Sequence, residues 1–218
     1  MKVASSNPEK ASVSRIAGSI AINISKLQRI GIQIGISMDK RDAILKAAGR
    51  LFAESGFGLV GVDLIAAEAG VTKRTLYKQF GSKAGLFEAW LDQRDVATRA
   101  FVFGSIEKRT SDPQAQILAL FEMVSLLAVD PSFHGCPFSR IMAERGDGEQ
   151  PGEALAIRHK AALRFWFAER VKAAELDECD EHVEELMTLY EGVLQRIAAT
   201  GSPSAAQAAI RLINKSWD

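Results

Sequence analysis

Residues 62–80 constrain the fold more than any other part of this sequence, because they form two short amphipathic segments separated by one tight turn. The first segment, VDLIAAE, ends at an Ala-Gly-Val corner in which Gly70 tolerates a positive φ and Val71 can fill the inside of the turn. The second segment opens on Thr72, a residue type that caps helix N-termini. Two short helices joined in this way are predicted to form a helix-turn-helix.

The second helix of this pair, TKRTLYKQF, is apolar on one side and basic on the other. Leu76 and Phe80 lie four residues apart and are predicted to face a small helical core, which leaves Lys73, Arg74, Thr75 and Lys78 on the outer side. In the first turn of such a helix an arginine can bond two acceptors of a guanine, and a threonine can contact thymine or a phosphate. A solvated basic face is the alternative interpretation, but the complete motif favours DNA binding.

Helical patterns continue on both sides of this pair. The preceding stretch, MDKRDAILKAAGRLFAESG, is predicted to be a helix with Asp39 as its cap and Gly56 as its stop. Gly81 ends the second helix of the pair, and Ser82 caps a further helix that runs to about Phe103. No run of strands and no internal repeat interrupts the helical pattern that follows, so the predicted fold class is all-α with about nine helices.

The chain is predicted to have three regions. Residues 1–37 are a polar and then Ile-rich extension that is expected to be disordered or not part of the native chain. Residues 38–94 form a three-helix domain containing the helix-turn-helix, and residues 95–218 form a helical domain for ligand binding and dimerisation. Two amphipathic stripes near the C-terminus are the candidates for a dimer interface built as a four-helix bundle: Leu186, Leu189, Val193, Ile197, Ile210 and Ile213.

Charge is distributed unevenly although the whole chain has a formal net charge of zero. Residues 1–37 carry five Lys or Arg and one Glu, and residues 38–94 carry nine basic against seven acidic side chains. Residues 95–218 carry thirteen basic against nineteen acidic side chains. The N-terminal half is therefore the part suited to a polyanion such as DNA.

Many of these residues stand at the spacing of the TetR family of bacterial regulators, which the sequence resembles over about residues 39–90. GCPFSRIMAE and HKAALRFWFAE, farther along, resemble the ligand domain of one TetR subgroup. The residues that carry the first resemblance are Ala48, Leu51, Phe52, Gly56, Ile65, Ala66, Ala69, Gly70, Val71, Leu76, Tyr77, Phe80, Lys83 and Leu86.

The resemblance implies a ligand-responsive transcriptional regulator that acts as a homodimer and needs neither enzymatic activity nor a cofactor. The implied partners are a palindromic operator in double-stranded DNA and a small effector molecule that releases a repressor from it. Tyr77 would contact a phosphate or base, and Gln79 and Lys83 would contact phosphates. The full set of predicted DNA-binding residues is Thr72, Lys73, Arg74, Thr75, Tyr77, Lys78, Gln79 and Lys83.

Two features depart from the family pattern. Family members begin close to the first helix, where Met38 stands, whereas this chain has 37 further residues in front of it. Gly61 occupies a position where the family often places Thr or Ser, so Asp63 is considered as an alternative cap for the second helix.

A ligand cavity is predicted in the C-terminal region, over residues 113–176. Small-molecule pockets have apolar walls with a few polar groups, and only His159 in the predicted lining can pair with a charge. The effector is therefore expected to be mostly apolar or aromatic. Plain core packing is the alternative for each predicted lining residue: Phe121, Met123, Phe138, Met142, His159, Trp166 and Tyr190. Phe165, Trp166 and Phe167 are consecutive, so they cannot all face one way.

Other chemistry is considered for the cysteines. Cys179 and His182 lack the further ligands that zinc needs, so a metal site is not predicted. His134 and Cys136 suggest a thiol nucleophile with its base, which keeps a small helical enzyme as an alternative, but no third orienting group is near in sequence. A helical interaction module that does not bind DNA is the remaining alternative.

Location follows from the same composition. Two cysteines suit a reducing cytoplasm better than a disulfide scaffold, although a Cys136–Cys179 bridge stays open. Polar residues interrupt the apolar stretch 16–36, which predicts no membrane span, and a signal peptide there is only weakly supported.

Overall fold

A computed structural model describes residues 39–144, 150–176 and 179–217 of the chain. The predicted extension over residues 1–37 lies outside the described residues. Within the described ranges the chain forms nine α-helices, one short 3-10 helix and no strand, which confirms the all-α class. The elements are α2 (Lys40–Leu59), α3 (Val62–Glu68), α4 (Lys73–Phe80), α5 (Lys83–Arg109), α6 (Pro113–Ser125), η1 (Leu126–Val129), α7 (Pro137–Ala143), α8 (Glu153–Ala173), α9 (Cys179–Thr200) and α10 (Ser204–Ser216).

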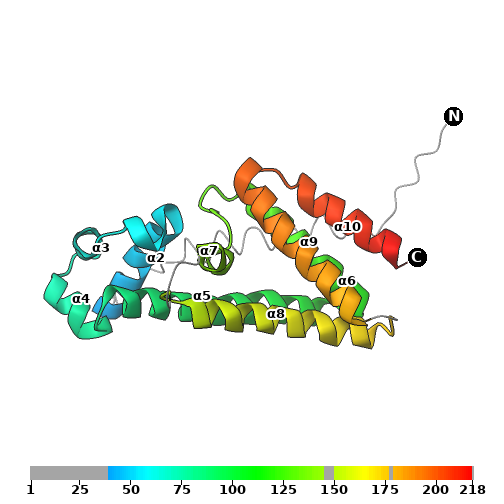
Figure 1. The fold of residues 1–218 in the computed structure, drawn as a ribbon, viewed down its shortest axis with the longest axis horizontal. Helices are drawn as coiled ribbons and strands as arrows, with labels where there is room; N and C mark the ends of the chain where they lie inside the picture. Colours follow the sequence, from blue (N-terminus) through cyan, green and yellow to red (C-terminus); the bar gives the residue numbers. More distant parts are fainter. Residues whose placement is uncertain (1–38, 145–149, 177–178, 218) are drawn as a thin grey trace.

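The helices are arranged along one long axis. The first three, α2, α3 and α4, lie at one end, while α6, α9 and α10 lie at the other (Figure 1). Helices α5 and α8 pack against each other and run along the length between the two ends (Figure 1). Since α5 has 27 residues, it alone spans roughly 40 Å at 1.5 Å per residue. A displacement of α5 therefore moves both ends of the molecule.

Helix caps set the boundaries around the helix-turn-helix. Thr72 Oγ1 accepts a hydrogen bond from the Thr75 amide at 3.2 Å and caps α4, and Gly81 ends α4 with φ 74°. Ser82 Oγ accepts from the Gly85 amide at 2.9 Å and caps α5. These predictions are confirmed, whereas α5 continues to Arg109, beyond the predicted end at Phe103.

Two local predictions are wrong. The cap position of α3 is Gly61, which forms no side-chain capping bond, while Asp63 lies inside the helix and pairs with Lys73 at 2.6 Å. The carboxylate is thus used to join α3 to α4. Gly56, with φ 79° and ψ 167°, does interrupt α2. The prediction that it ends the helix is wrong, because a further turn continues to Leu59.

Buried apolar side chains form two clusters. The N-terminal cluster fills the space between α2, α3, α4 and the start of α5, and it also includes Phe138 and Ile141 of α7 and Ala156 of α8. The C-terminal cluster joins α6, α8, α9 and α10 to Ile106 of α5. Cys136, directly before α7, packs against both clusters. Helix α7 therefore packs with the helix-turn-helix end although it follows α6 in the sequence.

Two glycines allow close packing at the helix-turn-helix end. A Cβ atom on Gly49 of α2 would lie 2.5 Å from Trp90 Nε1, so the glycine lets the indole approach the helix backbone. Gly152, with φ 83°, precedes α8, and a Cβ there would lie 2.4 Å from Leu91 Cδ1. These contacts bring α2 and α8 close to α5.

No helix in the ranges that the structure describes combines the length and the apolar character needed to cross a bilayer.

Candidate functional site

The helix-turn-helix presents one face of α4 at the end of the molecule (Figure 1). Leu76 is fully buried in the N-terminal cluster, and Phe80 packs against that cluster, as predicted. The opposite face is open, since Tyr77 is 45% exposed. Of the predicted DNA-binding residues, Thr72, Lys73, Arg74, Lys78 and Gln79 are also exposed, whereas Thr75 and Lys83 are half-buried.

The first turn of α4 is held in place by its own hydroxyl groups. Thr72 Oγ1 lies 3.0 Å from Thr75 Oγ1 in addition to accepting from the Thr75 amide. A rigid cap orients the exposed side chains that follow it, Lys73 and Arg74. This is the part of a recognition helix that reaches base edges in known DNA-binding motifs.

Two of the predicted DNA-binding lysines have protein partners. Lys73 Nζ lies 2.6 Å from Asp63 Oδ1 of α3, in an exposed ion pair that is weak in water. Lys83 Nζ lies 4.3 Å from the centroid of the Phe57 ring, a cation–π distance. Burial lowers the pKa of Lys83. Lys83 therefore lies against α2 in the free protein, and contact with a phosphate would require its side chain to turn.

A cavity of about 540 Å³ opens between α5, α6, α7, α8 and α9. Four of the seven predicted lining residues are on its wall: Met123, Phe138, His159 and Tyr190. The prediction is wrong for the other three. Phe121 and Trp166 are buried in the C-terminal cluster, and Met142 packs against the N-terminal cluster. Of the three consecutive aromatics, Trp166 and Phe167 face inward and Phe165 is 66% exposed.

The sequence did not reveal Asp95 of α5, which is fully buried beside this cavity. It accepts hydrogen bonds from Arg99 Nε at 3.0 Å and Arg99 Nη2 at 2.6 Å. Asp95 Oδ1 also lies 2.7 Å from His159 Nδ1 of α8. The His159 ring stacks on Phe138 of α7, with centroids 3.9 Å apart. A buried carboxylate therefore orients the imidazole and joins α5 to α8, and only the spacing of Asp95 and Arg99 signalled it in advance.

A second polar network includes Cys136, whose predicted partner was His134. His159 instead lines the same cavity as Cys136, and Lys160 Nζ lies 3.7 Å from the Cys136 sulfur. Burial raises the pKa of this thiol, but the His159 hydrogen bond, the Lys160 charge and bonds from Ser139 outweigh burial and lower the pKa to about 6. The sequence hid this arrangement because His159 and Lys160 come from α8, far along the chain.

The same lysine ties three helices together. Lys160 Nζ donates to Ser139 Oγ of α7 at 2.8 Å, and Ser139 Oγ donates to Glu191 Oε2 of α9 at 2.7 Å. Lys160 also forms an ion pair with Glu191. Burial, followed by the Cys136 and Glu191 charges, raises the pKa of the Tyr190 phenol far above its usual range, so the phenol stays protonated.

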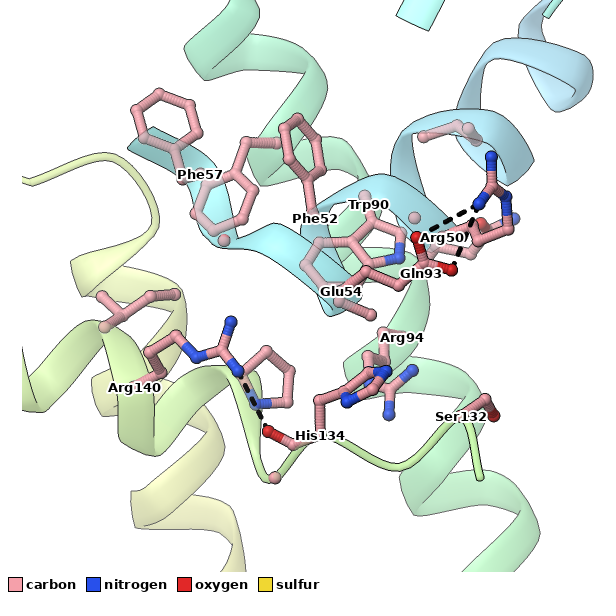
Figure 2. Close-up of a pocket in the computed structure, with 18 of the residues that line it drawn as sticks. Arg50, Phe52, Glu54, Phe57, Trp90, Gln93, Arg94, Ser132, His134 and Arg140 are labelled. Atoms are coloured by element: carbon pink, nitrogen blue, oxygen red, sulfur yellow. Dashed lines mark hydrogen bonds and ion pairs between the residues drawn. The ribbon is translucent and has the colours of Figure 1, made fainter. Parts of the chain in front are cut away.

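A larger cleft of about 970 Å³ separates the helix-turn-helix end from the segment before α7. In Figure 2, Phe52 and Trp90 lie on the side formed by α2 and α5, and Ser132, His134 and Arg140 lie across from them. Arg140 Nη2 donates to the His134 carbonyl at 3.0 Å, which holds the segment against α7. Arg94 lines both this cleft and the smaller cavity.

The predicted dimer residues lie mostly inside one chain. Leu186, Val193, Ile197 and Ile213 are 2–3% exposed in the C-terminal cluster, so they cannot also face a partner. In the single chain the stripe packs α9 and α10 onto α6 and α8. Leu189 and Ile210 are half-buried.

No metal site is found among the residues that the structure describes. His182 Nδ1 lies 3.2 Å from Glu185 Oε2, and no group of three His, Cys, Asp or Glu side chains there is placed to hold an ion.

Comparison with known proteins agrees with this architecture. The model of the tetR family of bacterial regulatory proteins matches residues 44–90. The HTH-type transcriptional activator FasR of Mycolicibacterium smegmatis is 34% identical over 84 residues, which are 38% of this chain and 38% of FasR. A TetR-family transcriptional regulator from Streptomyces coelicolor has a TM-score of 0.69 and 26% identity, over 80% of this chain and 95% of its own.

The fold is also shared with a complex that contains DNA. The TetR-family regulator CifR, solved as a cysteine mutant with 26-bp double-strand operator DNA, has a TM-score of 0.69 at 17% identity, over 84% of this chain and 99% of its own. An exposed, capped α4 over a buried core is the arrangement expected of a DNA-binding helix-turn-helix. Residues 44–90 thus match the tetR family of bacterial regulatory proteins, and the chain shares its fold with TetR-family regulators. Its relatives are regulators rather than enzymes, so the enzymatic alternative at His134 and Cys136 is set aside.

Proposed function

We propose that two copies of this chain bind a palindromic operator in double-stranded DNA and that a small molecule in the 540 Å³ cavity releases them. The observation that carries the proposal is the first turn of α4, where Thr72 caps the helix, Leu76 anchors it and Arg74 is exposed. Arg74 would bond a base edge, while Lys78 and Gln79 would contact phosphates. The site of action would be the cytoplasm.

Dimerisation would use the outer faces of α9 and α10, since their inner faces are buried. Leu189, Gly192 and Arg196 follow one another on one side of α9, and Gly192 and Arg196 are exposed. On α10, Leu212 is 56% exposed, a high value for a large apolar side chain. Two such helix pairs could form a four-helix bundle with a two-fold axis. Two α4 helices would then double the number of phosphate contacts.

Release would follow from the connection between the cavity and α4. Helix α5 begins directly after α4, and its residues Arg94, Phe101 and Val102 line the cavity. A ligand that binds better when α5 is displaced must lower operator affinity by linkage. Half-sites in successive major grooves lie about 34–36 Å apart, so a small displacement of each α4 would disturb the fit.

The cavity favours a small, mostly apolar effector. Phe101, Leu120 and Val124 contribute apolar walls, and Arg94 and His159 add two groups that can pair with a polar or negatively charged atom. Arg94 was not among the residues expected to line it. The compound would thus have an apolar body with one acceptor group.

The proposed sign of regulation is repression that the effector relieves. The relative FasR is named an activator, which is the opposite sign. The two signs are distinguished by measuring transcription from a reporter promoter that carries the operator, with and without the protein. Lower transcription with the protein, and recovery with an effector, are expected.

The DNA-binding proposal is tested by measuring binding to DNA that flanks the protein's own gene. Arg74→Ala should weaken specific binding by about 1–3 kcal/mol, and Lys78→Ala should weaken all sequences alike and flatten the salt dependence. Arg109→Ala, at the far end of α5, is the matched control and should bind normally. Equal affinity of the Arg74 variant and the wild type for specific DNA would exclude α4 as the reading helix.

A further inference from the structure

Cys136 lies at the point where the two halves of the molecule meet. It directly precedes α7, packs against both the N-terminal and the C-terminal cluster, and lines the 540 Å³ cavity. Part of its surface remains accessible. A group attached to its sulfur would enter the cavity and would contact the packing that joins α7 to α2 and α5.

The groups around the sulfur form a set of the kind that activates a thiol. Asp95 Oδ1 lies 2.7 Å from His159 Nδ1, and since a carboxylate can only accept, Nδ1 carries a hydrogen. The other nitrogen of His159 is then free to take the thiol proton, since His159 lines the same cavity as Cys136 and lowers the pKa of its thiol. Lys160 Nζ, 3.7 Å from the sulfur, adds a positive charge that stabilises a thiolate.

The carboxylate that orients His159 is itself fixed. Asp95 is fully buried and accepts two hydrogen bonds from Arg99, while Phe138 stacks on the imidazole. The three groups come from α5, α8 and the residue before α7. Cys136 is thus placed as the nucleophile, His159 as its base and Asp95 as the carboxylate that orients the base.

We propose that Cys136 is a covalent capture site for α,β-unsaturated carbonyl compounds with a small apolar body. The regulatory consequence of capture rests on the function proposed above, whereas the capture itself does not. The cavity contains what this class of compound requires. Phe101, Val102 and Tyr190 supply apolar walls of the cavity that Cys136 lines, and Arg94 in the same lining supplies a cation for the carbonyl oxygen.

The reaction needs no oxidant or other co-reactant. The thiol proton passes to His159, and the Cys136 thiolate attacks the β-carbon of the enone, forming a C–S bond. The C=C π electrons move to the carbonyl, whose oxygen becomes negative and can pair with Arg94. His159 then returns the proton to the α-carbon, which leaves a neutral ketone joined to Cys136 by a thioether.

Capture would change the contacts that hold α7. The thioether has no charge, so Lys160 loses its thiolate partner and keeps only Ser139 and Glu191. The added carbon skeleton occupies space beside Phe138, which stacks on His159 and belongs to the N-terminal cluster. Both effects act on the packing of α7 against α8, whose His159 is bonded to Asp95 of α5, so capture is expected to lower operator affinity.

The test treats the full chain with 2-cyclohexenone and follows intact mass, the modified peptide and operator affinity. Saturated cyclohexanone, which has nearly the same shape but no C=C bond, is the matched reagent control. Wild type and Cys179→Ser should each gain one adduct at Cys136, and their operator affinity should fall by about 5–150-fold. Cys136→Ser should gain no adduct there and should show the same operator affinity before and after treatment, and cyclohexanone should modify none of the proteins.

The pH dependence of capture separates an activated thiol from an ordinary one. The rate for wild type should rise with a midpoint near pH 6, since the folded-state pKa of Cys136 is lowered to about 6. His159→Asn and Lys160→Gln should move that midpoint upward while the circular dichroism spectrum stays helical. A wild-type midpoint near that of a free cysteine, or capture at Cys179 as fast as at Cys136, would overturn the proposal.

The two proposals fail in different ways. If untreated protein does not bind the operator but Cys136 still captures the enone, the proposed function fails and the capture site stands. If untreated protein binds the operator and the enone does not modify Cys136, the capture site is excluded. Modification of Cys136 without any change in operator affinity would exclude its regulatory consequence.

Discussion

At the scale of single residues, glycines decide how closely the helices approach. Gly152 has φ 83°, which disfavours a side chain, and a Cβ there would also meet Leu91 Cδ1 at 2.4 Å and Phe87 Cε1 at 3.2 Å. Gly104, in the C-terminal part of α5, has no atom within 4 Å of the corresponding position. The two glycines therefore differ in what they do for the fold.

Gly152→Ala should lower the free energy of unfolding by about 1–3 kcal/mol, because the left-handed backbone and the crowded site both oppose a Cβ. Gly104→Ala should instead raise it by up to about 1 kcal/mol, since alanine favours a helix interior and the site is open. Chemical denaturation of both variants measures the difference. A Gly152 variant as stable as the Gly104 variant would contradict this account of the contact with Leu91.

At the scale of elements, polar groups connect helices that are distant in sequence. Asp95 of α5 is fully buried between Arg99 and His159, whereas Asp92, one turn earlier, pairs with Arg158 where both side chains are more than half exposed. Both carboxylates join α5 to α8. Solvent screens the Asp92 pair, so only the Asp95 pair should matter for stability.

Asp95→Ala should destabilise the fold by about 1–3 kcal/mol, because His159 loses its acceptor inside the protein. Asp92→Ala should change stability by less than about 0.5 kcal/mol. Thermal unfolding followed by circular dichroism compares the two variants. Similar losses of stability in the two variants would show that burial does not make the Asp95 pair more stabilising than the Asp92 pair.

At the scale of the whole molecule, the arrangement in Figure 1 separates the helix-turn-helix at one end from α9 and α10 at the other. Helix α5 and the packing around α7 connect the two ends. This arrangement is consistent with a ligand that binds between the two ends and with two-fold pairing through α9 and α10. The proposed pairing face contains Leu212, which one chain leaves 56% exposed.

Leu212→Glu should convert a dimer to monomers, because a charge would be buried between the α10 helices, and operator binding should be lost with it. Ile157→Glu changes an apolar residue of α8 that is 49% exposed, and it should leave the mass of the dimer unchanged. Sedimentation or light scattering at micromolar concentration gives the mass, and DNA binding is measured in parallel. A monomeric wild type that binds a palindrome tightly would rule out this route to operator affinity.

The helix-turn-helix could be predicted from the sequence, because the interactions that define it are local. Thr72 and Ser82 cap helices through amides three residues away, Gly81 ends α4, and Leu76 is buried by its place in a short periodic pattern. The basic face of α4 follows from the same periodicity. These features depend on neighbours in the chain and would be predicted in any context that keeps the helices.

Whether an apolar residue lies in the core, on a cavity wall or on the free surface depends instead on how distant helices pack. The stripe on α9 that includes Val193 and Ile197 has the same spacing whether it faces a partner or its own chain, and its burial depends on α6 and α8. The residues around Cys136 could not be predicted for the same reason. Its partners His159 and Asp95 lie on α8 and α5, and periodicity within one helix carries no information on which distant helix will pack against it.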